Sequence, residues 1–265
     1  MPTYDNEIDI PVDEGKIAGT FVTPSERIPG ILFVHGWGGN QDQYLARARE
    51  AAALGCVSLT FDLRGHAHTS RMADTVSREN NLRDIVSAYD ALACHPQVDR
   101  SAIAVVGSSY GGYLATILTT MRPVKWLALR VPALYMDSDW DLPKRQLHKE
   151  QDLIAYRKSL IPATENRALR AASEFEGDVL IVESEFDNII PPAVLSNYRE
   201  AFIKSQSLTY RVMRGADHGL TDPACQRAYT QLLINWLDEM VFGDRGDHVP
   251  PPPRTAGDAS PETAF

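Results

Sequence analysis

Short apolar runs alternate with amphipathic stretches along most of the 265-residue chain. The apolar runs predict buried strands, and stretches with apolar residues three or four positions apart predict helices. Buried strands that alternate with helices indicate a parallel sheet covered on both faces. The predicted strands are 30–34, 56–61, 102–106, 124–131, 178–182 and 208–213, and the predicted helices are 41–54, 79–94, 110–120, 223–242 and one that follows Pro191-Pro192.

The beginning, the end and one internal segment break this rhythm. Residues 7–12 and 16–23 alternate apolar and polar positions around an Asp-Glu-Gly turn, which is typical of a β-hairpin. Residues 132–176 contain charged helical stretches and no clear strand, so they are predicted as a cap inserted between two late strands. We therefore expect a single domain over 1–242 that includes this cap, followed by a Pro-rich tail over 243–265.

The charge balance and the composition narrow the class of protein. The chain has 26 Lys and Arg against 35 Asp and Glu, a net charge of −9, so nucleic acid and anionic membrane surfaces are not expected as partners. No apolar run approaches the roughly 18 residues of a membrane span, and the first residues do not resemble a secretory signal. Three widely spaced cysteines exclude a disulfide scaffold and a CxxC zinc site. We therefore expect a cytoplasmic enzyme or binding domain, and a homo-oligomer is compatible with the sequence.

The segment Gly107-Ser108-Ser109-Tyr110-Gly111 matches the pattern G-x-S-x-G. Alone the match is weak, because Gly and Ser are common residues. Here it follows a predicted strand and opens a predicted helix, which is the context that a nucleophile elbow requires. This context predicts Ser109 as a nucleophile and disfavours a plain glycine-rich connector.

A nucleophilic serine needs a neighbouring base, and that base needs an acid to orient it. Of the seven histidines, His218 lies directly after the last predicted strand, where a loop reaches the carboxyl edge of the sheet. Asp187 follows the preceding strand and is the predicted acid. Glu183 and Glu185 are alternatives, but the first lies in or at the end of the strand and the second lies too early in the loop.

Two backbone N–H groups are expected to bind the oxyanion formed in acyl transfer. Tyr110 follows the nucleophile, and Trp37 lies in the glycine-rich turn after an earlier strand, so their amides are the predicted donors. His35 in the same turn is predicted to be structural. His66 and His68 form an HxH pair that lacks convincing third and fourth zinc ligands, so no metal is expected. Hydrolysis through a serine acyl-enzyme needs no organic cofactor either, so none is expected.

Together these motifs resemble those of the α/β-hydrolase fold serine hydrolases over roughly residues 7–242. The resemblance implies an α/β fold with a mostly parallel central sheet flanked by helices, and the chain order Ser…Asp…His. Two positions where relatives often carry glycine, Ala67 and Ser184, depart from the pattern without removing a catalytic group. The segments that carry the resemblance are HGWGG at 35–39, DLRGH at 62–66, GSSYGG at 107–112, SEFDNIIP at 184–191 and DHG at 217–219.

Within this family, GSSYGGY resembles the dienelactone-hydrolase and prolyl-oligopeptidase-like branches, and the insertion resembles the small caps of cinnamoyl and feruloyl esterases. Such caps cover the substrate site, which implies by analogy that Tyr135, Trp140 and Leu142 line a pocket; packing of the cap onto the sheet explains them equally well. The expected activity is hydrolysis of a small-molecule carboxylic ester through an acyl-enzyme on Ser109. A thioesterase, an amidase or peptidase, and a hydrolase-like protein that binds a ligand without turnover stay open as alternatives.

Overall fold

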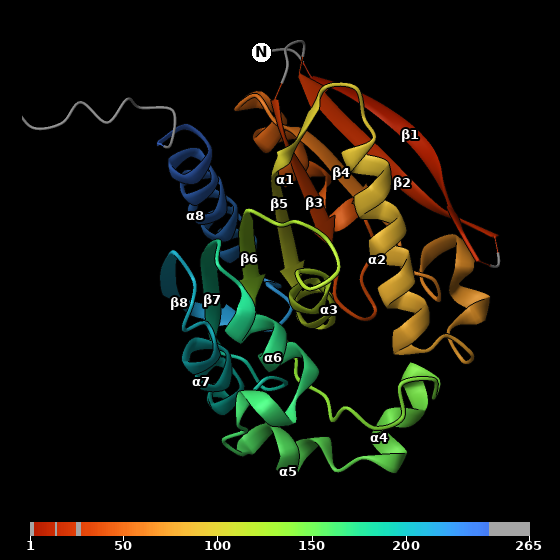
Figure 1. The fold of residues 1–265 in the computed structure, drawn as a ribbon, viewed down its shortest axis with the longest axis vertical. Coiled ribbons are helices and arrows are strands. Elements are labelled where there is room, and N and C mark those ends of the chain that lie inside the picture. The colour runs from red at the N-terminus through yellow and green to blue at the C-terminus, as the bar shows by residue number, and fades with distance from the viewer. Residues whose placement is uncertain (1–2, 14, 25–27, 244–265) are drawn as a thin grey trace, which may run out of the picture.

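The computed structural model describes residues 3–13, 15–24 and 28–243, and in these ranges eight strands form one sheet. The strands are β1 (Thr3–Val12), β2 (Gly15–Pro24), β3 (Ile28–Val34), β4 (Val57–Phe61), β5 (Val98–Ser108), β6 (Trp126–Arg130), β7 (Asp178–Phe186) and β8 (Ser207–Asp217). Their order across the sheet is β1-β2-β4-β3-β5-β6-β7-β8 (Figure 1). Strand β1 pairs antiparallel with β2, and β2 pairs antiparallel with β4. The remaining neighbours, β4-β3-β5-β6-β7-β8, all pair in parallel. The predicted α/β fold with a mostly parallel sheet is confirmed.

Helices cover both faces of the sheet. One face carries α1 (Asp42–Ala53) and α8 (Pro223–Phe242), and the other carries α2 (Arg78–Ala93), α3 (Tyr110–Leu118), α6 (Arg167–Glu174) and α7 (Pro192–Ala201). Side chains of the β3 strand alternate between the two resulting cores. Ile31 and Phe33 join the core under α1 and α8, whereas Leu32 and Val34 join the core under α2 and α3. This double burial explains why the central strands are uninterrupted apolar runs.

Polar caps fix where several helices begin. The Ser77 hydroxyl accepts from the Asn80 amide, and the Asn80 side chain accepts from the Ser77 amide, a reciprocal pair that starts α2. Asn166 and Asp222 accept from amides in the first turns of α6 and α8 in the same way. The amphipathic patterns therefore become helices at defined positions.

The segment between β6 and β7 consists of short helices and loops. These are η2 (Lys144–Gln146), α4 (Leu147–Glu150), α5 (Leu153–Lys158) and η3 (Ala163–Glu165), followed by α6. Helices α4 and α5 lie beyond the carboxyl ends of the parallel strands (Figure 1), whereas α6 packs against α3 and α7. Arg78 ties the segment to α2, because its fully buried guanidinium donates to the carbonyl oxygens of Met136 (2.7 Å) and Ser138.

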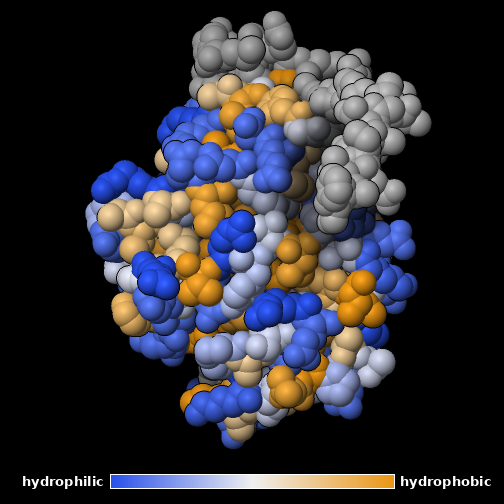
Figure 2. All heavy atoms as spheres, turned by 90° about the vertical axis from the view of Figure 1, so that its left-hand side faces the viewer, coloured by the Kyte–Doolittle hydropathy of each residue, from blue (hydrophilic) through white to orange (hydrophobic). Residues whose placement is uncertain are grey.

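The predicted tail over 243–265 lies outside the described residues apart from Gly243. None of the described helices combines the length and the apolar character needed to cross a membrane. On the side of the molecule that is on the left in Figure 1, hydrophobic and hydrophilic residues are interspersed (Figure 2).

Candidate active site

Ser109 is the single residue between the end of β5 and the first residue of α3. Its backbone has φ 51° and ψ −116°, a strained conformation for a side chain larger than glycine. The Ser109 amide donates to the Arg130 carbonyl (2.9 Å), and the Ser109 carbonyl accepts from the amides of Tyr113 (3.1 Å) and Ala133 (2.9 Å). These three hydrogen bonds hold the strained backbone of Ser109 in place and keep its hydroxyl at the carboxyl edge of the sheet.

The glycines around Ser109 allow strand and helix to approach closely. A Cβ atom at Gly107 would lie 2.7 Å from the Cα atom of Gly112, and one at Gly111 would lie 2.4 Å from the carbonyl oxygen of His35. Both distances are shorter than real Cβ contacts allow. The G-x-S-x-G spacing is therefore a packing requirement of this turn.

The loops after β7 and β8 bring an acid and a base to Ser109. His218 Nε2 lies 3.1 Å from Ser109 Oγ, and His218 Nδ1–H donates to Asp187 Oδ2 at 2.7 Å. The other carboxylate oxygen of Asp187 accepts from the amides of Ile189 and Ile190, each at 2.8 Å. Burial alone raises the pKa of Asp187, but the hydrogen bonds from His218 and from these two amides outweigh it and leave the pKa below its usual value.

The two alternative acids lie elsewhere. Glu185 accepts a hydrogen bond from the amide of Gly215 (2.7 Å), on the neighbouring strand β8. Glu183 lies within β7, where burial raises the pKa of its carboxyl group. Asp187 is therefore the acid that the structure brings to His218.

A hollow of about 160 Å³ adjoins Ser109 and His218 on the side of the glycine-rich turn after β3. The Trp37 ring lies edge-on to the rings of Tyr110 (5.6 Å between centroids) and His66 (4.7 Å). As the first residue of α3, Tyr110 has an amide that no bond within the helix uses. The residues lining the hollow are Gly36, Trp37, Gly38, Gly39, Gln43, Tyr44, Ser108, Ser109, Arg130, His218 and Gly219.

Two buried histidines hold this glycine-rich turn. His35 Nδ1–H donates to the Gly36 carbonyl (2.8 Å), and His35 Nε2 accepts from the Leu63 amide (3.0 Å). His66 Nε2 accepts from the amide of Gly38 (3.0 Å), and its Nδ1–H points to main-chain carbonyls. Burial lowers the pKa of His35 to about 3 and also lowers the pKa of His66. Both imidazoles are therefore neutral and hold the turn through hydrogen bonds to the main chain.

The HxH pair therefore divides between two environments. Both ring nitrogens of His66 are engaged with the main chain, whereas His68 is exposed. Across the described parts of the chain, no three His, Cys, Asp or Glu side chains gather in a way that could hold a metal ion.

The three residues suggested as pocket-lining pack in the core that contains Tyr110 and Tyr113 of α3. Tyr135 is buried, with its ring edge-on to Tyr110 (5.8 Å) and Tyr113 (5.0 Å). Trp140 stacks on Tyr113 (6.3 Å), and Leu142 is half-buried against the same core. None of the three is among the residues that line the hollow beside Ser109.

Lys144 is a buried cation that sequence reasoning missed. The residue is only 2% exposed. Its ammonium lies 4.8, 5.3 and 4.9 Å from the ring centroids of Trp37, Tyr110 and Tyr135, respectively. Burial alone raises the pKa of Tyr135, but the positive charges of Lys144 and Arg157 outweigh it and lower the pKa. In the sequence, Lys144 lies in a charged stretch that is typical of a solvated surface, so no local signal indicated this position.

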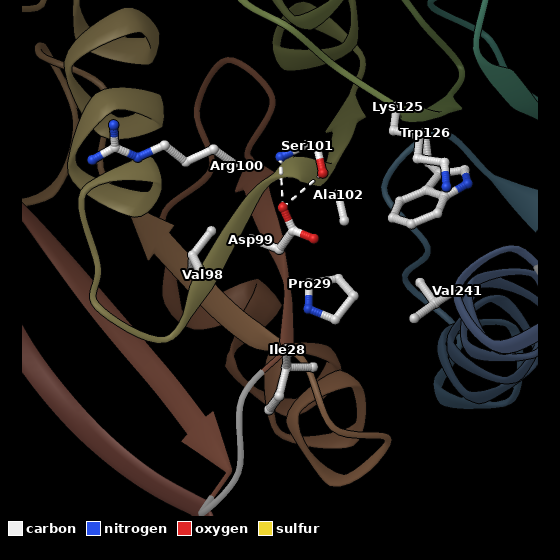
Figure 3. A pocket seen from close by; sticks show the side chains of 10 residues that line it. All are labelled: Ile28, Pro29, Val98, Asp99, Arg100, Ser101, Ala102, Lys125, Trp126 and Val241. Atoms are coloured by element: carbon white, nitrogen blue, oxygen red, sulfur yellow. Dashed lines mark hydrogen bonds between the residues drawn. The ribbon is translucent and has the colours of Figure 1, made fainter. Parts of the chain in front are cut away.

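A larger hollow, of about 760 Å³, lies at the opposite end of the strands (Figure 3). Its lining comes from the beginnings of β3, β5 and β6, and the Asp99 carboxylate in it accepts from the amide (2.9 Å) and hydroxyl (2.7 Å) of Ser101. The lining residues are Ile28, Pro29, Val98, Asp99, Arg100, Ser101, Ala102, Lys125, Trp126 and Val241, which offer no serine–histidine pair.

The model of the prolyl oligopeptidase family matches residues 43–243, which span the elbow, the acid loop and the histidine loop. The chain belongs to this family. Its members share the α/β-hydrolase fold with serine hydrolases of the esterase, peptidase and thioesterase types, so the resemblance seen in the sequence is confirmed.

The proteins similar to this chain differ in their named activity and in the share of their length that the match covers. A probable dipeptidyl-aminopeptidase B from Talaromyces marneffei is 33% identical over 100 residues, which cover 34% of this chain and only 11% of that protein. The mitochondrial palmitoyl-protein thioesterase ABHD10 from Bos taurus is 23% identical over 236 residues, which cover 80% of this chain and 73% of that protein. The crystal structure of a dienelactone hydrolase from Anabaena variabilis superposes with a TM-score of 0.65 at 18% identity, covering 90% of this chain and 99% of the other.

Proposed function

We propose that this family member is a serine esterase that hydrolyses a carboxylic ester through an acyl-enzyme on Ser109. The observation that carries the proposal is the hydrogen-bonded series from Ser109 Oγ to His218 (3.1 Å) and from His218 to Asp187 (2.7 Å) beside a small hollow. Because hydrogen bonds keep the pKa of Asp187 low, its carboxylate accepts from His218 Nδ1–H and leaves Nε2 to receive a proton.

In the proposed reaction, Ser109 Oγ attacks the ester carbonyl carbon while its proton passes to His218 Nε2. The amides of Trp37 and Tyr110 donate to the oxyanion of the tetrahedral intermediate. The C–O bond to the alcohol then breaks, and the alcohol leaves with the proton from His218. A water molecule, deprotonated by the same histidine, attacks the acyl-enzyme and releases the carboxylic acid. No step requires a metal or an organic cofactor.

The hollow of about 160 Å³ beside Ser109 and His218 is the proposed place for the group next to the reacting carbonyl. We propose residues 132–176 as a cap over the remainder of the substrate. Half-buried Trp140 and Leu142 are its candidate contacts, and buried Tyr135 would support the site through its packing on Tyr110.

A thioester is the second candidate substrate, because the same acyl-enzyme chemistry applies to it. The observation that favours it is the match to a palmitoyl-protein thioesterase over 80% of this chain. Peptide or amide cleavage uses the same groups and is the activity suggested by the relatives that match a third of the chain.

The first experiment tests whether Ser109 is a nucleophile. Treatment with a fluorophosphonate, followed by intact-mass measurement, is expected to give one adduct on the wild-type protein and none on Ser109→Ala. Ser101→Ala, which removes a hydroxyl at the opposite end of the strands, is the matched control and is expected to keep the adduct. Failure of the folded wild-type protein to form an adduct would favour ligand binding without turnover.

The second experiment separates the substrate classes. An acetyl group is offered as its p-nitrophenyl ester, its phenyl thioester and its p-nitroanilide, and kcat/KM is measured for each. We expect the ester to exceed the anilide by about 100-fold or more, a difference of about 2.7 kcal/mol in the barrier. A higher kcat/KM for the thioester than for the ester would replace the ester proposal with the thioesterase.

A further inference from the structure

Arg130 is a buried arginine whose guanidinium reaches three neutral oxygen atoms. The residue is 7% exposed and ends strand β6. Its Nε donates to Ser108 Oγ (3.1 Å), its Nη1 donates to Ser184 Oγ (3.3 Å), and its Nη2 donates to the carbonyl oxygen of His218 (2.7 Å). By contrast, buried Arg64 pairs with the carboxylate of Asp84.

These acceptors lie on three different parts of the carboxyl edge. Ser108 ends β5, Ser184 lies in β7, and His218 follows β8. In addition, the main-chain carbonyl of Arg130 accepts from the Ser109 amide (2.9 Å). One residue therefore contacts the main chain of both the nucleophile and the base.

The His218 loop needs such an anchor because β8 is the edge strand of the sheet. The loop has strand neighbours on one side only, and Leu220 in it adopts a positive φ of 51°. A charge-assisted bond of 2.7 Å from a guanidinium that is itself fixed by two hydroxyls limits the movement of the His218 carbonyl. The packing of the Arg130 guanidinium carbon 5.7 Å from the Tyr229 ring centre further fixes the side chain.

We propose that Arg130 is a positioning residue that sets the distance between His218 and Ser109. The inference rests on the catalytic roles proposed above. Arg130 acts through the histidine loop and keeps His218 Nε2 within reach of the Ser109 hydroxyl. Loss of this anchor lowers the rate of proton transfer, whereas substrate binding continues through the other ten residues that line the hollow.

The test compares kcat and KM for p-nitrophenyl acetate in Arg130→Ala and in the wild-type protein. We expect kcat to fall about 100-fold, because small misplacements of reacting groups have effects of that size. We expect KM to change by less than about threefold, since the lost bond orients His218 and is made to the enzyme's own carbonyl oxygen, not to the substrate. Because Arg130 lines the hollow beside Ser109, guanidinium chloride at about 50 mM, far below denaturing concentrations, is expected to restore part of the lost kcat.

Arg47→Ala is the matched control. Arg47 is similarly buried, lies 4.9 Å from the same Tyr229 ring and donates to a main-chain carbonyl, that of Gln43 (2.8 Å), in helix α1. It has no bond to the His218 loop, so we expect its kcat to stay within about threefold of wild type and to gain nothing from guanidinium.

Several outcomes would overturn the inference. A folded Arg130→Ala protein with wild-type kcat would do so, as would equal losses or equal guanidinium recovery in Arg130→Ala and Arg47→Ala. If Arg130→Ala does not fold, Arg130→Lys decides: the ammonium cannot span three acceptors, so kcat is expected to fall about tenfold at constant KM, and wild-type kcat would contradict the role. Fluorophosphonate labelling of wild-type Ser109 tests the proposed function separately, because it does not depend on any Arg130 variant.

Discussion

The two ends of the parallel strands carry hollows of different size and content. At the amino ends, about 760 Å³ is lined by the beginnings of β3, β5 and β6, together with Val241 of α8 (Figure 3). At the carboxyl ends, about 160 Å³ is lined by loops, among them those that carry Ser109 and His218. The larger hollow contains one carboxylate bonded to its own neighbouring serine, and the smaller contains a serine hydrogen-bonded to a histidine.

The end at which we propose the chemistry is therefore distinguished by the direction of the strands and not by the size of its hollow. In a parallel sheet all carboxyl ends meet at one edge, so residues distant in sequence converge there. Ser109 and His218 are 109 positions apart, yet each directly follows a strand. At the amino ends, Asp99 accepts from Ser101 and Arg100 donates to the Ala93 carbonyl.

The largest expected effect is that of Ser109→Ala at the carboxyl end. We expect kcat for an activated ester to fall about 10⁵-fold or more, because the covalent route is lost. Unfolding in urea is expected to show unchanged or slightly increased stability, since the Ser109 hydroxyl is not needed for packing. Retention of more than a hundredth of the wild-type rate would show that another group carries the chemistry.

A smaller effect is expected for Asp187→Asn, which keeps the size of the side chain. We expect kcat to fall about 10⁴-fold, because an amide cannot hold the required tautomer of His218 or stabilise its imidazolium. The measurement is kcat for p-nitrophenyl acetate, and Glu185→Gln is the control. Glu185 accepts from the Gly215 amide, so we expect kcat of Glu185→Gln to stay within about threefold of wild type. Equal losses in both variants would contradict the assignment of the acid.

His35, in the turn at the carboxyl end of β3, is expected to make the free energy of unfolding depend on pH. In the unfolded chain this histidine binds a proton below about pH 6.5, whereas in the folded protein burial lowers its pKa to about 3. Between these values the unfolded state binds more protons, so the free energy of unfolding falls as the pH falls, by up to about 1.4 kcal/mol per pH unit from this residue.

Urea unfolding at about pH 5.5 and pH 4.5 measures this slope. His35→Gln retains an acceptor for the Leu63 amide but does not titrate, so its slope is expected to be shallower by about 1.4 kcal/mol per pH unit. An identical slope in both proteins would show that His35 does not titrate differently in the two states.

The smallest effect is expected at the amino end. Ser101→Ala removes the hydroxyl that bonds to Asp99, an exposed interaction within one turn. We expect stability to fall by less than about 1 kcal/mol and kcat to stay within about twofold of wild type. A loss of activity beyond tenfold would show that the two ends of the strands are coupled.

The sequence predicted the strands, the strand–turn–helix around Ser109 and the positions of Asp187 and His218 in the loops after two late strands, because each of these features depends on a local pattern. Apolar runs mark the doubly buried strands, and the glycines around Ser109 are needed by contacts within one turn. The alternation of strand and helix then places the three polar residues at one edge without any further information.

Long-range partners of charged residues could not be predicted in the same way. Arg130 donates to residues 54 and 88 positions away, and Lys144 lies among rings from three separate parts of the chain. A basic residue at the end of an apolar strand was the only local sign of Arg130. At Ala67 the sequence showed a departure from glycine, but only the structure shows that this alanine adopts a positive φ of 43°.

The position of Lys144 has a consequence for the exchange of amide hydrogens. Its ammonium joins the turn of Trp37, the start of α3 and the segment of Tyr135, so these three parts cannot separate without removing a buried charge from its aromatic surroundings. The Lys144 amide bonds to the Val76 carbonyl, and the Gly38 amide bonds to His66. We therefore expect the amides of Lys144 and Gly38 to exchange with the same opening free energy, as parts of one cooperative unit that joins the turn beside Ser109 to the inserted segment.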